Sequence, residues 1–178
     1  YFPNWAEENA TIWWSNVVKA VSSIAKNQPD KMEKIKAIGV SGMVPAIVLL
    51  DKDGNPVRNT IQQNDSRALS QIERITEALD QDKLYERTGG YTNQQHILPR
   101  LLWVKENEPE VWDKVETILG SYDYIVYKLT GVKSLEMNWA VESGSFDIRT
   151  RQWITEDLER FGISPKLLPQ VNPSMNIV

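Results

Sequence analysis

Residues 35–51 read IKAIGVSGMVPAIVLLD, two short apolar runs separated by a turn that contains glycine and proline. The first run covers residues 35–41 and the second covers residues 46–51. Each run is too short for a typical helix and is apolar enough to lie in a sheet that is covered on both faces. We therefore predict two neighbouring strands of one sheet, joined through the turn at residues 41–45.

The sequence on either side of these runs alternates between helical and strand-like patterns. Residues 9–26 repeat apolar side chains at a spacing of three to four, and Asn9 is a suitable N-cap for this helix. Asp53-Gly54 is a hairpin signal, and residues 57–62 are the expected return strand. Further helices are expected from residue 66, over 97–107, from Pro109 and over 122–129, with short strands over 115–119 and 143–148. This order predicts a mixed α/β fold with its strands early and its helices late.

The composition of the 178 residues excludes several classes of function. The net charge is −4 and no basic cluster is present, which argues against a nucleic-acid partner. No apolar run reaches the ~18 residues of a membrane span, so we expect no membrane partner. The chain has no cysteine, which excludes disulfides and thiolate metal sites and favours a reducing, cytoplasmic compartment.

The sequence contains no local motif that assigns a catalytic group. Neither GxGxxG nor GxxxxGK[ST] is present, so no glycine-rich phosphate loop is predicted. His96 is the only histidine, which excludes a histidine metal cluster, and nothing near it resembles a nucleophile elbow.

Polar residues gather in three stretches, at the places where strands should end. These stretches are residues 41–45, 62–67 and 92–96. Because strand-end loops of an α/β sheet gather at one edge, their amides and carboxylate could bind the hydroxyls of a polyol.

Structural roles remain open for the same residues. Asp65 could instead cap the helix that follows it or pair with Arg67. His96 could be a hydrogen-bonded packing residue at the start of an apolar helix. The pair Gln62 and Gln63 could form a polar strand edge without contacting any ligand.

The order and spacing of motifs along nearly the whole chain resemble the FGGY carbohydrate kinases, especially their xylulokinase-like branch. Residues 38–42 (IGVSG) are similar to the family's IGISGQ strand, and residues 64–67 (NDSR) match its ND.R. Residues 99–110 resemble PKLLWL.E.EPE, and residues 122–131 resemble KDYL.Y.LTGE. Shorter similarities cover residues 4–14, 48–58 and 146–153.

The resemblance implies an actin-like, ribonuclease-H-like ATPase fold, in which two such domains flank a cleft. Residues 1–178 would be most of the N-terminal, sugar-binding domain, truncated at its first strands, and the ATP-binding domain would lie outside them. Without those first strands the sheet should expose an unpaired edge, which would destabilise the chain or join two copies into a homodimer.

The implied activity is the ATP-dependent phosphorylation of a hydroxyl of a small sugar, ketose or polyol. ATP and Mg²⁺ would be bound mainly by parts of the enzyme outside this chain. The family's Asp-x-Gly-Thr phosphate loop and its catalytic Asp have no counterpart here, so no catalytic residue is assigned. A non-catalytic sugar-binding or scaffold domain of kinase ancestry is the alternative.

The resemblance places residues from all three polar stretches at the sugar: Val44, Pro45, Gln63, Asn64, Asp65, Gln95 and His96. Several depart from the family. Xylulokinases have Met and His at Val44 and Pro45 and a Trp at Gln63, whereas Gln95 stands where glycerol kinases have a sugar-contacting Tyr. These exchanges leave the identity of the substrate open. Trp139, in another family motif, could stack on the sugar or be buried in the core.

Overall fold

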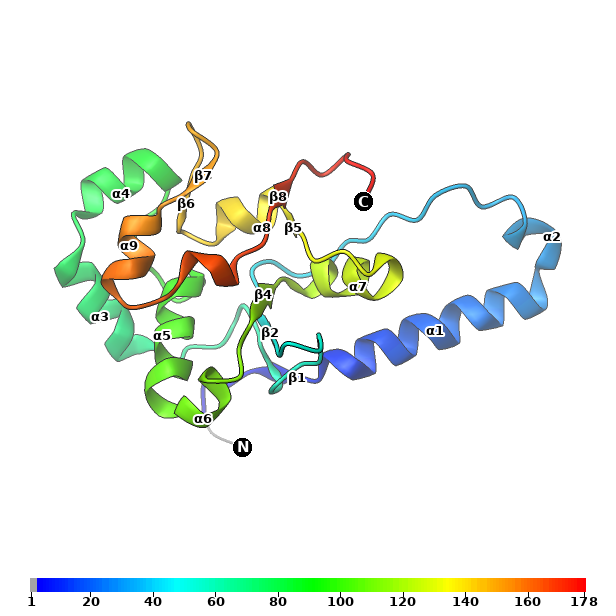
Figure 1. Cartoon of the computed structure of the whole chain (residues 1–178), viewed down its shortest axis with the longest axis horizontal. Helices are drawn as coiled ribbons and strands as arrows, with labels where there is room; N and C mark the ends of the chain where they lie inside the picture. The colour runs from blue at the N-terminus through cyan, green and yellow to red at the C-terminus, as the bar shows by residue number, and fades with distance from the viewer. Residues whose placement is uncertain (1–2) are drawn as a thin grey trace.

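The computed structural model describes residues 3–178, and a narrow antiparallel sheet lies at its centre (Figure 1). Strand β2 (Val48–Leu50) pairs with β4 (Thr117–Leu119), and all of their residues are buried. On the other side, a bridge between Ile47 and Ile61 connects β2 to β3 (Thr60–Ile61). Strand β3 in turn pairs with β1 (Glu7–Glu8), so the N-terminal segment is part of the central structure.

Helices cover this sheet and extend from it. They are α1 (Ala10–Asn27), α2 (Pro29–Met32), α3 (Leu69–Ala78), α4 (Gln81–Thr88), α5 (Ile97–Asn107), α6 (Pro109–Trp112), α7 (Ser121–Thr130), α8 (Met137–Glu142), α9 (Thr155–Arg160) and the 3₁₀ helix η1 (Pro165–Leu167). Two further pairings are the parallel pair β5 (Leu135–Glu136) and β8 (Val171–Asn172), and the hairpin of β6 (Phe146–Asp147) and β7 (Gln152–Trp153). Within residues 3–178, no helix is both long enough and apolar enough to cross a membrane.

Helix α5 is the most deeply buried helix of the domain. Its first eight residues, from Ile97 to Val104, are all buried, and α3 and α6 pack against it. A helix that is buried on every side must satisfy any charge it carries inside the protein. Arg100 is the charged residue in this buried segment, and its side chain has no exposed surface.

Most of the predicted elements are confirmed. The side chain of Asn9 caps α1 by accepting a hydrogen bond from the backbone N–H of Thr11, at 2.9 Å. Helix α5 has the predicted bounds, and α7 ends at Thr130, where Gly131 caps it in the left-handed conformation. The return strand is shorter than predicted, because only Thr60 and Ile61 pair as a strand after the turn at Gly54.

The predicted strand over residues 35–41 is wrong. These residues form no strand, all except Val40 are exposed, and they belong to a long connection that runs from α2 back to β2 (Figure 1). A strand requires a neighbour with free backbone groups. Both edges of β2 are occupied, one by β4 and the other by bridges to Ile61 and Pro56. The two apolar runs are therefore not neighbouring strands.

Trp139 is buried, which confirms packing in the core rather than exposure to a ligand. Its side chain has no exposed surface, and its Nε1 donates a hydrogen bond to the carbonyl oxygen of Ala46 at 2.9 Å. The ring lies directly against Gly120, where an added Cβ would be 2.4 Å from Cδ1 of Trp139. The indole of Trp139 therefore holds the segment before β2 in place. A side chain larger than that of glycine at position 120 would overlap with this ring.

We expect Gly120→Ala to lower the free energy of unfolding of the intact protein by about 1–3 kcal/mol, because the new methyl group must displace both Trp139 and the carboxylate of Asp123. Denaturant unfolding would measure the change. Gly39→Ala is the matched control, since no atom lies within 4 Å of a Cβ at that exposed position. The control should stay within about 0.5 kcal/mol of the unsubstituted protein. Equal stabilities for the two variants would contradict the packing role of Gly120.

Candidate functional site

The buried side chain of Arg100 joins two of the three polar stretches. Its Nε donates to the carbonyl oxygen of His96 at 3.2 Å, and its Nη1 donates to the carbonyl oxygen of Gln62, also at 3.2 Å. Its Nη2 donates to the carbonyl oxygen of Gln95. One guanidinium group therefore fixes the segment after β3 next to the segment before α5.

The third stretch is attached to the same region through the central sheet. The backbone N–H of Ile47 donates to the carbonyl oxygen of Ile61, and this antiparallel bridge attaches the segment that follows Pro45 to the segment that precedes Gln62. From the other side, Oγ of Ser121 donates to the carbonyl oxygen of Met43 at 2.7 Å. Pro45 itself is buried and Val44 is half-buried, so this stretch contributes an apolar wall.

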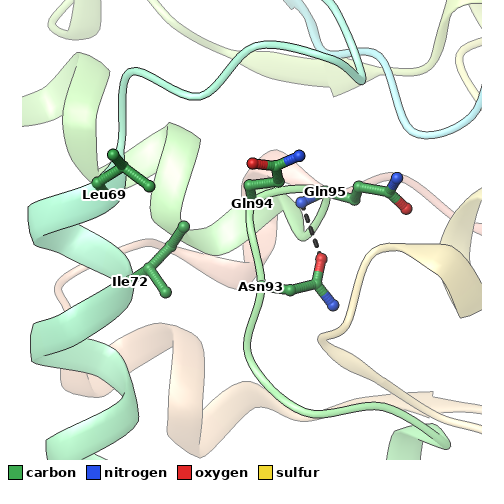
Figure 2. A pocket seen from close by; sticks show the side chains of 5 residues that line it. All are labelled: Leu69, Ile72, Asn93, Gln94 and Gln95. Carbon is green, nitrogen blue, oxygen red and sulfur yellow. Dashed lines mark hydrogen bonds between the residues drawn. The ribbon is translucent and has the colours of Figure 1, made fainter.

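Side-chain amides on the two joined segments are free to bind a ligand. Asn64 and Gln95 are exposed and Gln63 is half-buried, and within residues 3–178 none of the three side chains makes a hydrogen bond. Beside them, a shallow hollow is lined by Leu69, Ile72, Asn93, Gln94 and Gln95. Figure 2 shows Oδ1 of Asn93 accepting a hydrogen bond from the backbone N–H of Gln95, at 2.8 Å, while the Gln95 side chain points away from Leu69 and Ile72.

Asp65, in contrast, has no acceptor capacity left. Its Oδ1 accepts from the backbone N–H and the Nε of Arg67, at 3.0 and 2.9 Å. Its Oδ2 accepts from Nη2 of Arg67 at 2.7 Å and from the backbone N–H of Ala6 at 2.6 Å. Each carboxylate oxygen thus has two donors, which fills its lone pairs. Burial alone would raise the pKa of Asp65, but the hydrogen bonds from Arg67 and Ala6 outweigh it and hold this pKa below its usual range.

The predicted pairing of Asp65 with Arg67 is confirmed, and the alternative that Asp65 caps a helix is wrong. Helix α3 begins at Leu69, and its N-cap is Ala68, so Asp65 lies outside the helix. The Arg67 guanidinium also contacts Glu7 through Nη1 at 2.7 Å and lies over the ring of Trp5, 3.9 Å from its centroid. The pair therefore anchors the N-terminal segment against the segment after β3.

Asp65→Ala should lower the free energy of unfolding of the intact protein by about 3 kcal/mol, because it leaves the buried Arg67 charge with Glu7 alone. Chemical denaturation would measure this loss. The double variant Asp65→Ala/Arg67→Met also removes the unpaired charge of Arg67, so it should recover part of the lost free energy of unfolding. Unchanged stability in Asp65→Ala, together with a weakened affinity for sugar, would show instead that this carboxylate binds the ligand.

The ring of His96 packs inside the domain. Its Nε2 lies 3.1 Å from Nδ2 of Asn93, and a Cβ added at Gly144 would be 2.1 Å from its Nδ1. Burial, followed by the nearby charge of Arg100, lowers the pKa of His96 to about 4. The imidazole is therefore neutral at pH 7 and is held against the backbone of Gly144, as the packing alternative describes.

An NMR titration of the intact protein should give His96 a pKa of about 4, compared with about 6.5 for a free imidazole. Because the folded-state pKa is the lower one, His96 contributes stability above pH 6.5, and this stability is lost as the pH falls through 6.5 toward 4. The variant His96→Gln would identify the NMR signal of His96, because that signal would be missing. Its stability should fall less than that of the unsubstituted protein between pH 6.5 and 4. A measured pKa near 6.5 would mean that the ring is solvated.

No group of three or more His, Cys, Asp or Glu side chains gathers within residues 3–178 in an arrangement that could hold a metal ion. We therefore assign no ligand of Mg²⁺ in this chain.

Sequence reasoning did not identify Arg100, the residue that organises the site. One signal for it was present, since a single arginine interrupts the apolar residues Ile97, Leu98, Leu101 and Leu102. Charged side chains are almost never fully buried unless they have partners, so such an interruption indicates a specific set of acceptors.

Known proteins contain the same arrangement of segments. Residues 2–178 match the family model described as "FGGY family of carbohydrate kinases, N-terminal domain". The xylulose kinase of Lactococcus lactis subsp. lactis (strain IL1403) is 31% identical over 167 residues, which cover 94% of this chain and 33% of the relative. A glycerol kinase of Thermococcus gammatolerans is 28% identical over 179 residues, which cover 98% of this chain and 36% of the relative.

A solved structure agrees with these sequence matches. The crystal structure of xylulose kinase from Rhodospirillum rubrum superimposes with a TM-score of 0.87 at 31% identity, over 96% of this chain and 36% of that one. The chain therefore spans about a third of the length of the curated relatives it matches.

Proposed function

Since this chain belongs to the FGGY family of carbohydrate kinases, we propose that the intact protein phosphorylates a hydroxyl of a small sugar, with ATP as the donor. The acceptor is a ketose or polyol of the size of xylulose or glycerol, as the names of the relatives suggest. In this reaction the hydroxyl oxygen attacks the γ-phosphorus of ATP, the bond to ADP breaks, and a base takes the hydroxyl proton. Residues 1–178 supply the sugar-binding side.

The observation that carries this proposal is the joining of two amide-bearing segments by Arg100. Its hydrogen bonds to the carbonyls of Gln62 and Gln95 hold the segments that present Gln63, Asn64 and Gln95. A primary amide offers both donors and acceptors, which suits a polyol whose hydroxyl groups do both. Preorganised amides on two segments can bind hydroxyls at opposite ends of one small molecule.

The other predicted site residues shape the wall of the same site. Val44 and Pro45 provide its apolar part, where a sugar presents C–H groups. Asp65 is buried and saturated by Arg67 and Ala6, and the half-buried ring of His96 packs on Gly144, so neither is assigned a direct contact with the sugar. Within this chain, the side chains proposed to contact the sugar are thus amides rather than charged groups.

ATP and Mg²⁺ are assigned to parts of the intact enzyme outside this chain. Within residues 3–178 there is no set of metal ligands, and the sequence has no glycine-rich phosphate motif. We propose that the catalytic base likewise lies outside residues 1–178, as the family resemblance implies. We propose a cytoplasmic location, where ATP and free sugars are both available.

The intact protein should release ADP in the presence of ATP only when a suitable ketose or polyol is added, as measured by a coupled assay over a sugar panel. Residues 1–178 alone should release none. Gln95→Ala should raise the KM for the sugar about tenfold, as expected when one polar contact is lost. Its melting temperature should not change, because this exposed amide makes no hydrogen bond within the described residues.

Gln152→Ala is the matched control, because it removes an exposed amide from β7, outside the joined segments. Its sugar KM should stay within about twofold of the unsubstituted value. Sugar binding without any ADP release would favour the non-catalytic sugar-binding alternative. Absence of both binding and ADP release over the whole panel would contradict the proposed function.

A further inference from the structure

Arg100 is a fully buried charge that has no carboxylate of its own. Its side chain has no exposed surface, and it makes no ion pair within residues 3–178. The carboxylate whose charge acts on it is that of Asp65, which is already filled by Arg67 and Ala6. The charge of the guanidinium is therefore stabilised mainly by backbone carbonyl dipoles. Loss of any of these acceptors would leave part of a buried charge unsatisfied.

The acceptors of Arg100 come from segments far apart in the sequence. The carbonyl of His96 is at the N-cap of α5, close to Arg100 itself, whereas the carbonyl of Gln62 belongs to the segment after β3, 38 residues away. Arginine can serve both because its guanidinium carries five N–H donors in a rigid planar fork. A lysine presents one flexible ammonium group and cannot hold the same set in the same geometry.

The carbonyls that Arg100 holds belong to residues that carry a free side-chain amide or directly precede one in the chain. One belongs to the peptide unit that joins Gln62 to Gln63, and the other belongs to Gln95, whose own side chain is free. The guanidinium lies below the surface and has no exposed atom with which to contact a ligand. Its influence on a bound molecule is therefore indirect, through the separation of the two segments.

We propose that Arg100 is a positioning residue that sets the distance between the amides of Gln63 and Gln95, and thereby determines which small polyol fits. This inference rests on the proposed function. Burial lowers the pKa of Arg100 to about 10, although the charge of Asp65 opposes this shift. The guanidinium therefore remains charged at neutral pH and donates its hydrogen bonds to the carbonyls.

Steady-state kinetics of the intact protein test the proposal. Arg100→Lys should raise the KM for the sugar about tenfold and leave the KM for ATP within about twofold, because only the sugar-binding segments lose their spacing. Arg100→Met should raise the sugar KM further. The control is Arg74→Lys, which makes the same exchange at an exposed arginine that pairs with Glu106 on the surface. It should leave both KM values unchanged.

The outcomes separate this inference from the proposed function. Absence of sugar-dependent ADP release by the unsubstituted protein would defeat the proposed function. An active unsubstituted protein with a folded Arg100→Lys variant of unchanged sugar KM would overturn the positioning role alone. A merely structural role would change the KM values for sugar and for ATP together, whereas the positioning role changes the sugar KM alone.

A structure of the unsubstituted protein with its sugar bound keeps the proposal testable if the Arg100 variants do not fold. We expect the guanidinium on the carbonyls of Gln62 and Gln95, without contact to the sugar, and the sugar between the amides of Gln63 and Gln95. A direct contact between Arg100 and the sugar, or a sugar bound away from these amides, would overturn it.

Discussion

The structure of this domain depends on the burial of one guanidinium group. Arg100 lies in the part of α5 that is buried on every side, and it satisfies its charge with backbone carbonyls rather than with a carboxylate. Carbonyls that are free to accept occur where regular structure ends, so the requirements of Arg100 bring the ends of two segments together. The need to satisfy a buried charge thereby holds together the backbones of two segments that are distant in the sequence.

A second buried arginine fixes the same surface from its other end. Arg67 holds Asp65 through two of its nitrogen atoms and contacts Glu7 with a third, while its guanidinium lies over Trp5. The segment between β3 and α3 is therefore held at Gln62 by Arg100 and at Asp65 by Arg67. Each arginine is buried with hydrogen bonds to acceptors inside the domain, and the amide side chains of Gln63, Asn64 and Gln95 are not among these acceptors.

The family, the fold class and most helices could be predicted from the sequence, because these depend on motif order and local periodicity. Helix α5 has its predicted bounds since its apolar residues and its terminal signals agree. Residues 35–41 were wrongly predicted as a strand, because strand pairing depends on which edges remain free, and both edges of β2 are occupied. The burial of Arg100 has a signal in the sequence, but its partners could not be predicted, since the acceptor at Gln62 is 38 residues away and is a backbone group that any residue type provides.

Hydrogen–deuterium exchange of the intact protein, with and without its sugar, tests most directly whether the two joined segments form one binding surface. Sugar binding should slow exchange of the backbone amides in residues 62–65 and 93–96 together, because one ligand orders both segments. The exposed connection at residues 35–41 should be unaffected and provides an internal reference. Protection of only one segment, or of neither, would contradict the claim that Arg100 assembles a single sugar site from them.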